Sequence, residues 1–308
     1  MTGVGAALDA ASRGLRVALI EASDLAAGTS SRSSKLIHGG LRYLEQLEFP
    51  LVHEALRERG LLATRLAPHL VRPVPFLVPL PAETPGVAGV AKRAWHRLYY
   101  GAGVALYDAF AGLVGGGRGM PLHRHLTQSG ARRLFPSLRE EGLAGAIRYY
   151  DGQVDDARFV VTVARTAASL GAAVVTGVEA VGLLRQARQV TGVRVSADGA
   201  EFDVRAKTVV AATGCGATTC RRGCPTRGSA SGCGPQGVHL VVPRSAITGE
   251  VGLILRTASS VLFVIPWGGH WIIGTTDTDW ELDRAHPAAS ARTSTTCCRT
   301  STRCSTGR

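Results

Sequence analysis

Hydroxyl, cationic and imidazole side chains gather in "GTSSRSSKLIHGGLRYLEQ", which covers residues 28–46. Serine hydroxyls donate and accept hydrogen bonds, arginine and lysine bind anions, and paired glycines let the backbone approach a flat ligand. A solvated polar loop is the alternative, but hydrophobic residues recur within this polar segment. The segment is therefore a candidate binding site, and its members are Thr29, Ser30, Ser31, Arg32, Ser33, Ser34, Lys35, His38, Gly39, Gly40, Arg42 and Tyr43.

A second pattern opens the sequence, where "MTGVGAALDAASRGLRVALIE" runs from a helix-forming stretch into a strand. A dinucleotide-binding βαβ unit needs glycines at a helix N-terminus, and an acidic residue about 20 residues further on that binds ribose hydroxyls. Gly3 can be the third glycine of this fingerprint, which permits close helix–strand packing, and Glu21 ends the strand after 17 intervening residues. The alternative is a surface glutamate after a buried strand. We expect the sequence to begin inside the fingerprint, without its first strand.

Composition indicates a soluble globular protein, with 45% hydrophobic and 19% charged residues among 308. Such a length can bury one large core or two modest ones. No signal peptide is predicted, since no basic segment precedes an apolar run at the start. The most apolar stretch, residues 98–117, contains Asp108 and many glycines, so we expect a buried or interfacial helix rather than a membrane span.

The net charge of +12 would favour nucleic acid or anionic lipid as a partner, but its distribution weakens that inference. Residues 215–236 and 291–308 together hold seven arginines, no acidic residue and all seven cysteines. The cysteine spacings fit no zinc site, and a disulfide framework would need export, which nothing else indicates. If the codons of the last segment are read from the third base of Arg292, suitable degenerate bases give Asp-Ile-Asp-Tyr-Leu-Leu, a pattern typical of an amphipathic helix. We therefore expect both segments to be out of frame or disordered, and no metal site.

Periodicity predicts the elements that would position these residues. Helices are expected over 3–13, 51–67 and 155–172, with Gly14 and Gly171 as stops and Asp155 or Asp156 at the cap, and the stretch 86–140 is expected to be rich in helix. The proline-rich residues 68–85 suit extended or edge-strand backbone. Further predicted strands are 17–21, a short buried strand at 173–177, a meander at 180–205, a central strand at 206–214, and strands after 237 with a hairpin at Gly268-Gly269.

Helix and strand patterns thus alternate with an antiparallel sheet along one chain, which predicts an α/β protein of two interleaved domains. We expect a Rossmann-type FAD/NAD(P)-binding domain at 1–67 and 150–214. A substrate domain containing the antiparallel sheet is expected at 68–149 and 237–290.

Long motifs in this sequence resemble FAD-dependent glycerol-3-phosphate dehydrogenases. The resemblance covers residues 1–214 and 237–290, and its motifs are 28–46, "ALRERGLLATRLAPHLVRPVPFLVP", "YYDGQVDDARFVVTVARTAASLGA", "GVHLVVPR" and "VLFVIPWGGHWIIGTTDTDW". It implies an FAD-binding domain interleaved with a substrate domain. The family's first strand and its later part lie outside the printed sequence.

The resemblance also implies roles for individual residues. Gly3 and Glu21 would serve the ADP part of FAD, Val178 would be a further cofactor-binding residue, and Ala212, Thr213 and Gly214 would make a second contact with FAD. Residues 29–35 and His38 to Gly40 would line the pyrophosphate and the flavin. Arg42 and Tyr43 would face the substrate pocket, and His239 is the candidate base near the substrate C2 hydroxyl, with a satisfied strand histidine as the alternative.

The implied reaction oxidises sn-glycerol 3-phosphate to dihydroxyacetone phosphate and passes electrons to quinone. The protein would then sit peripherally on the cytoplasmic face of the cell membrane, without nucleic acid as a partner, and as a possible homodimer. Three alternatives stay open: an oxidase that uses O₂, an inactive fragment of such an enzyme, and a nucleic-acid- or metal-binding protein that uses the Cys/Arg segments.

Overall fold

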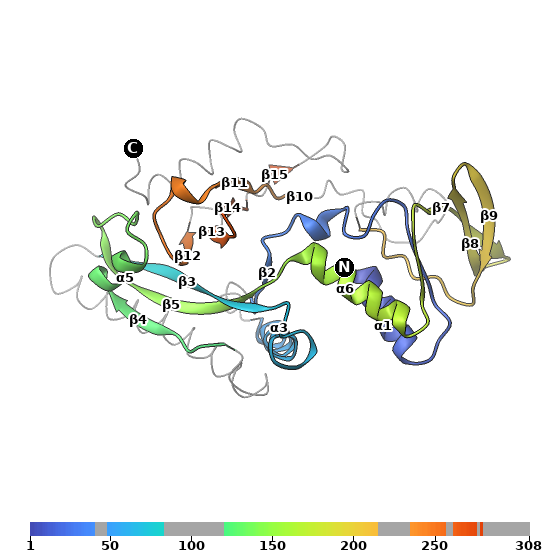
Figure 1. Cartoon of the computed structure of the whole chain (residues 1–308), viewed down its shortest axis with the longest axis horizontal. Helices are drawn as coiled ribbons and strands as arrows, with labels where there is room; N and C mark the ends of the chain where they lie inside the picture. The colour runs from blue at the N-terminus through green and yellow to red at the C-terminus, as the bar shows by residue number, and fades with distance from the viewer. Residues whose placement is uncertain (41–47, 83–119, 215–234, 257–260, 276–277, 280–308) are drawn as a thin grey trace. The chain divides into compact units, whose positions relative to one another are not determined.

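The computed structural model describes residues 1–40, 48–82, 120–214, 235–256, 261–275 and 278–279 (Figure 1). They fall into two compact units, each made of more than one stretch of chain. The first unit contains Met1–Ser33 and the described part of Asp155–Cys233. The second contains the described parts of Ser34–Val154 and Gly234–Trp280. The chain therefore leaves the first unit after Ser33 and returns to it at Asp155.

A parallel strand pair with two helices forms the centre of the first unit. Helix α1 (Thr2–Ser12) leads to β1 (Ala18–Glu21), and α6 (Asp156–Ser169) leads to β6 (Ala173–Thr176). The strands pair in parallel from Ala18 opposite Ala173, and the helices lie side by side (Figure 1). Small residues allow this close approach: the buried cluster holds Ala7, Ala11, Ala167 and Ala172. Both predicted helices and the strand 17–21 are confirmed within one to three residues.

Helix ends follow the predicted chemistry. The side chain of Asp155 accepts a hydrogen bond from the backbone N–H of Arg158 (3.2 Å), so Asp155 is the N-cap of α6. Gly14 and Gly171 follow α1 and α6 at φ +76° and +95°, a left-handed backbone that glycine adopts without a steric penalty. The predicted meander is also confirmed as β7 (Glu179–Gln186), β8 (Gln189–Ala197) and β9 (Ala200–Arg205).

Two predictions for the first unit are wrong. Residues 206–214 form no strand, because no strand among the described residues pairs with them, and a strand needs a hydrogen-bonded neighbour. Strand β6 is expected to be buried, yet Val175 is 43% exposed. Of the residues of β6, Val174 packs against the helices, and the alternate residues face away from them.

The second unit is built on an eight-stranded sheet. Along it the strands run in the order β11 (Leu240–Pro243), β14 (His270–Gly274), β13 (Val261–Trp267), β12 (Gly252–Arg256), β3 (Arg72–Pro81), β5 (Leu143–Gln153) and β2 (Leu36–Ile37), with β4 (Arg124–Thr127) also paired to β5. Every pairing is antiparallel except β12 with β3. The predicted Gly268-Gly269 hairpin joins β13 to β14. A separate pair joins β10 (Pro235–Gln236) to β15 (Thr278–Asp279).

The proline-rich strand β3 is extended as predicted, but it lies inside the sheet and not at its edge. Its four prolines occupy odd positions, 73, 75, 79 and 81, so their missing N–H groups lie along one side of the strand. The other side pairs with β5 along its whole length. The β12 side pairs only at Phe76 and Leu77, between the prolines. An interior strand therefore accommodates prolines by confining them to its weakly paired side.

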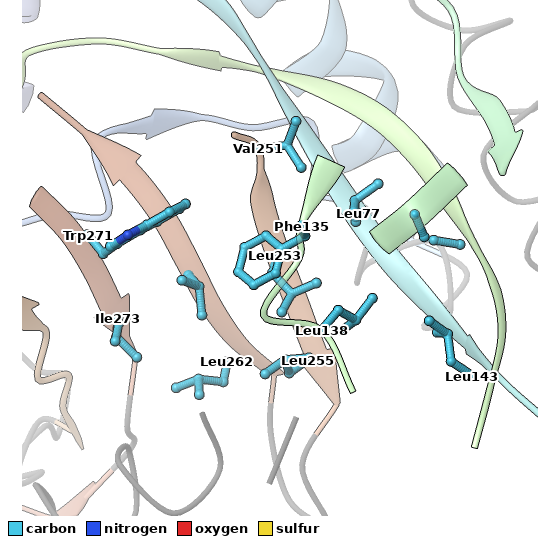
Figure 2. Close-up of a cluster of buried hydrophobic side chains, with 13 residues drawn as sticks. Leu77, Phe135, Leu138, Leu143, Val251, Leu253, Leu255, Leu262, Trp271 and Ile273 are labelled. Carbon is cyan, nitrogen blue, oxygen red and sulfur yellow. The ribbon is translucent and has the colours of Figure 1, made fainter. Parts of the chain in front are cut away.

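Both faces of this sheet are buried, since neighbouring residues of each strand enter different clusters. On one face Leu77, Leu253 and Trp271 pack with Phe135 and Leu138, which both follow α5 (Gln128–Leu134) (Figure 2). On the other face the cluster includes Phe76, Ile254 and Ile272, and it is covered by Val52 and Leu56 of α3 (Phe49–Leu61), which continues into the π-helical turn η2 (Leu62–Leu66). The described residues of 34–67 thus pack with the sheet unit, whereas we expected them in the FAD-binding domain.

Several predictions fall on residues outside the described parts of the chain. They are Arg42 and Tyr43, the apolar stretch 98–117, most of the helix-rich stretch 86–140, and almost all of the two Cys/Arg segments. Among the helices that the structure describes, none is both long enough and apolar enough to cross a membrane.

Candidate functional site

Glu21 lies at the end of β1, where the predicted fingerprint needs an acidic residue. One of its carboxylate oxygens accepts a hydrogen bond from the backbone N–H of Ser23 (3.1 Å). Val178 is buried and donates its backbone N–H to the carbonyl oxygen of Glu21 (3.0 Å). The first unit thus places Glu21 beside Val178, two residues that are 157 positions apart in the sequence.

The serine-rich loop of the first unit meets the N-terminal ends of both helices. A 3₁₀ turn, η1, covers Thr29–Ser31. The Ser30 hydroxyl accepts a hydrogen bond from the amino group of Met1 (2.9 Å), and the Ser33 hydroxyl donates to a carboxylate oxygen of Asp156, in the first turn of α6. Asp156 is only 4% exposed, so the bond from Ser33 also satisfies a buried carboxylate. Sequence analysis considered Asp156 only as a possible cap of this helix, and the structure assigns the cap to Asp155.

Gly3 and Ala212 come together in the first unit. A Cβ placed on Gly3 would lie 3.5 Å from Ala212 Cβ and 3.5 Å from Leu19 Cδ1, which is ordinary contact. Thr213 and Gly214 follow directly, and Gly214 has φ +55°. Packing among the described residues therefore leaves room for a methyl group at position 3, so the close helix–strand packing expected of a third glycine does not by itself require glycine there.

Gly3→Ala is therefore expected to separate folding from binding. The stability of the chain should stay the same or rise by up to about 1 kcal/mol, because alanine favours helix more than glycine does. If the ADP part of FAD lies against Gly3, as its assignment implies, the added methyl group should lower the affinity for FAD by about tenfold or more. Titration of the protein into FAD, followed by flavin fluorescence, measures this affinity. Gly5→Ala is the matched control, since a Cβ there meets nothing within 4 Å; equal FAD affinity in the two variants would contradict the role of Gly3.

The residues of the first unit fit the adenosine part of FAD. A carboxylate stands at the end of a strand in a parallel pair, where it can accept hydrogen bonds from a ribose diol. Serine hydroxyls and small residues gather near the N-terminal ends of two helices, which favour anionic groups such as phosphate.

A second group of residues lies in the sheet unit and centres on His239. The Ser34 hydroxyl and His239 Nε2 are 3.0 Å apart, although the residues are 205 positions apart in the sequence. His239 immediately precedes β11, and Ser34 lies two residues before β2. The structure therefore brings together two residues that we had assigned to different roles, one to the cofactor and one to the chemistry.

Gly274, at the end of β14, packs directly on the His239 ring. A Cβ on Gly274 would lie 2.6 Å from His239 Cδ2 and 2.6 Å from the carbonyl oxygen of Val238, closer than real Cβ atoms come. Only glycine fits at position 274 while His239 keeps this place. Sequence analysis did not single out Gly274, although it lies in the motif "HWIIGTTD".

Two cations approach the indole of Trp267 near this site. Lys35 Nζ and Arg72 Cζ lie 5.8 Å and 5.9 Å from its ring centroid, a distance at which cation–π attraction operates. Arg72 donates from Nε and Nη2 to the side-chain oxygen of Gln153 (3.0 and 2.6 Å), and Gln153 Nε2 donates to the carbonyl oxygen of Pro266 (2.9 Å). Gln153, only 1% exposed, thereby joins β3, β5 and β13. Sequence analysis missed this network, although Gln153 falls in a recognised motif.

A hydrogen bond within the turn links His38 to Gly40. The N–H of Gly40 donates to His38 Nδ1 (3.1 Å), and Gly40 has φ +70°, where glycine avoids strain. Because Nδ1 accepts, Nε2 carries the proton in the neutral ring of His38. Gly39 and Gly40 are buried and His38 is exposed. Among the described residues, no group of three or more His, Cys, Asp or Glu side chains could hold a metal ion.

Burial of His239 lowers its pKa below the ordinary value of 6.5, and the positive charge of Lys35 lowers it further. The ring is therefore neutral at pH 7 and able to accept a proton. Between its folded pKa and 6.5 the unfolded chain binds more protons at this residue. Its contribution to stability therefore rises with pH across that interval and is lost on acidification.

Lys35→Gln is expected to raise the pKa of His239, because it removes one of the two causes of the depression. The titration of the His239 ring protons by NMR measures this directly. Arg16→Gln is the matched control, since it removes one positive charge from an exposed residue that is not among the causes of the lowered His239 pKa. A His239 titration that is the same in the Lys35 variant would contradict the electrostatic assignment.

Comparison with known proteins gives consistent matches. The sequence model of the FAD dependent oxidoreductase family matches residues 1–302. Glycerol-3-phosphate dehydrogenase from Mycobacterium leprae is 56% identical over 292 residues, covering 94% of this chain and 48% of the relative. The human mitochondrial glycerol-3-phosphate dehydrogenase is 41% identical over 307 residues, covering 94% of this chain and 40% of the relative. These identities confirm the resemblance on which the site assignments rest.

Two solved structures share the fold. Glycerol-3-phosphate dehydrogenase from Bacillus halodurans, complexed with FAD, superposes with a TM-score of 0.70 at 24% identity, over 98% of this chain and 51% of that one. L-α-glycerophosphate oxidase from Mycoplasma pneumoniae, with FAD bound, gives 0.63 at 13% identity, over 97% and 75%. The predicted fold class is thereby confirmed. The chain spans about half of the length of its mycobacterial relatives, at 48%. By its sequence match and its fold, this chain belongs to the FAD dependent oxidoreductase family.

Proposed function

We propose that this chain carries the FAD-binding and proton-accepting residues of an enzyme that oxidises sn-glycerol 3-phosphate to dihydroxyacetone phosphate. The observation that carries this proposal is the 56% identity to a mycobacterial glycerol-3-phosphate dehydrogenase across 94% of the chain. The family model matches residues 1–302, a range that includes both described units and, with them, all of the assigned residues except Arg42 and Tyr43.

Residues of each unit hold the cofactor in this proposal. Glu21 accepts from the ribose, and the backbone at Gly3 with Ala212, Thr213 and Gly214 contacts the dinucleotide, beside Val178. Residues 29–35 and His38 to Gly40 supply hydroxyls, cations and bare backbone to the pyrophosphate and flavin. FAD, when bound, supplies the acceptor for the hydride that leaves C2 of the substrate.

His239 removes the proton in this proposal. Oxidation of an alcohol breaks the C2–H and O–H bonds and forms a carbonyl, so the hydroxyl proton needs an acceptor as the hydride leaves. A half-buried, neutral imidazole beside Lys35 suits that task. Arg42 and Tyr43 hold the substrate, with Arg42 binding its phosphate, since a guanidinium pairs well with a phosphate group.

Quinone is the proposed electron acceptor, which places the enzyme peripherally on the cytoplasmic face of the cell membrane, as a possible homodimer. Oxygen is the alternative acceptor, supported by the fold shared with a glycerophosphate oxidase. A single measurement distinguishes them: hydrogen peroxide accumulates during turnover only if O₂ takes the electrons.

The test is to express the full chain, add FAD, and follow flavin absorbance and substrate oxidation. Flavin absorbance retained after desalting, with reduction of the flavin by glycerol 3-phosphate but not by glycerol or glycine, supports the proposal. Retained flavin that an amine such as glycine reduces, and glycerol 3-phosphate does not, contradicts the substrate. A chain that retains no flavin supports the alternative of an inactive fragment.

A further inference from the structure

We propose that Ser34 is a positioning residue that engages Nε2 of His239, so that Nδ1 is the atom that takes up the substrate proton. The identity of the proton donor rests on the proposed function, whereas the positioning of the ring does not. The contact that carries the inference is the 3.0 Å approach of the Ser34 hydroxyl to Nε2.

The backbone around Ser34 is fixed by the sheet. The next residue, Lys35, has φ +61°, a left-handed conformation that a side-chain-bearing residue rarely adopts. Its carbonyl oxygen accepts from the N–H of Val154 (3.0 Å), and β2 begins at once, with Leu36 opposite Gln153. Since Gln153 is bonded to both Arg72 and Pro266, Ser34 lies two residues before a strand whose first pairing partner is itself held in the sheet.

The His239 ring is confined from a different strand. Leu240, the next residue, pairs with Ile273 in the β11–β14 ladder, which places Gly274 against the ring. The approach is so close that no side chain fits at position 274. Ser34 lies two residues before β2, and Gly274 ends β14. A hydrogen bond from the first and a steric contact from the second therefore restrict the orientation of the His239 ring, and β2 and β14 belong to the same sheet.

A serine hydroxyl suits this task because it can both donate and accept. While His239 is neutral with a proton on Nε2, the Ser34 oxygen accepts that proton's hydrogen bond and Nδ1 keeps its lone pair. After Nδ1 takes up a proton the same hydrogen bond persists and becomes charge-assisted, which stabilises the imidazolium. Lys35 is the charged side chain that acts on His239 among the described residues, and it opposes that charge.

NMR of the full chain tests the positioning without cofactor or substrate. Nitrogen shifts of the ring are expected to show Nε2–H as the main neutral form of His239, assigned by comparison with His239→Gln. In Ser34→Ala the titration midpoint should fall by about half a pH unit or more, which corresponds to a modest hydrogen bond. Ser34→Thr, which keeps the hydroxyl, should restore it. A main form protonated at Nδ1, or an unchanged titration in Ser34→Ala, overturns the proposal.

Two controls separate local from general effects. Ser33→Ala removes the neighbouring hydroxyl, which bonds to Asp156, and should leave the His239 titration as it is. In the FAD-loaded chain, Ser34→Ala should lower kcat by about tenfold with little change in KM, as expected for the loss of orientation of a base, and Ser34→Thr should recover it. Ser169→Ala, at an exposed helix end, is the activity control.

The two readouts fail independently. An unchanged kcat in a Ser34→Ala chain whose His239 titration has moved would overturn the assignment of Nδ1 to proton uptake. A chain that oxidises no glycerol 3-phosphate would contradict the proposed function. In that case the NMR titration would still decide whether Ser34 positions His239.

Discussion

Replacing Arg59 with alanine is expected to lower the free energy of unfolding by about 3–5 kcal/mol, the usual cost of removing one member of a buried ion pair. Arg59 and Asp151 are each 2% exposed, and Arg59 Nη1 lies 2.5 Å from a carboxylate oxygen of Asp151. The same nitrogen donates to the carbonyl oxygen of Tyr150 (3.3 Å), so the guanidinium joins α3 to β5. Denaturant unfolding followed by circular dichroism measures the loss.

A double variant checks the cause of this loss. In Arg59→Met with Asp151→Leu both charges are absent, so the chain should be more stable than Arg59→Ala alone. The exposed pair Arg194–Asp203, at 2.8 Å, provides the control, because solvent screens it. Arg194→Ala should change the unfolding midpoint far less than Arg59→Ala does. Equal midpoints for the two alanine variants would contradict a special role for the buried pair.

The helix ends and the hairpin turn could be predicted correctly because residues close by in the sequence determine them. The helix expected at residues 3–13 is observed at Thr2–Ser12, because Gly14 ends it and alanines fill its buried face. Asp155 caps α6, and Gly268-Gly269 turns the β13–β14 hairpin as the dipeptide indicated. In these cases the signal and its partner lie within a few residues of each other, so one sequence is enough to recognise them.

Predictions failed where the outcome depends on distant neighbours. Residues 206–214 have the composition of a central strand, but no described strand pairs with them. The prolines of β3 suited extended or edge-strand backbone. The strand is extended as predicted, but it lies between β5 and β12, an interior position with which the alternate spacing of its prolines is compatible. In both cases the decisive fact is the identity of the neighbouring strand, which a period within one segment does not encode.

In the candidate site, too, the assigned roles could be predicted from the sequence, but the contacts between distant residues could not. Motif resemblance assigned roles to Ser34 and His239, but it could not indicate that they contact each other, since 205 positions separate them. Nor did it indicate Gln153, whose amide links β3 to β13 through Arg72 and Pro266. The roles of the assigned residues toward FAD and substrate stay predictions, while their placement within each unit now gives these predictions a geometry to test.

His239→Gln is expected to lower kcat for oxidation of glycerol 3-phosphate by about 10²–10⁴-fold, the usual contribution of a general base. Glutamine keeps the polarity of the position but accepts no proton near neutral pH. The variant's remaining rate should rise with pH as hydroxide takes the proton, whereas the unsubstituted enzyme should lose activity only below pH 6.5, because burial and Lys35 lower the pKa of His239.

Steady-state kinetics with an artificial electron acceptor, together with flavin absorbance, would measure this effect. Flavin content should stay the same in His239→Gln, so that a lower rate reflects proton removal rather than loss of cofactor. His270→Gln is the matched control, because His270 is exposed on the β13–β14 hairpin and has no part in the proposed site. If both variants kept full kcat, His239 would be a structural strand histidine that Ser34 and Gly274 hold in place, and another residue would have to accept the proton.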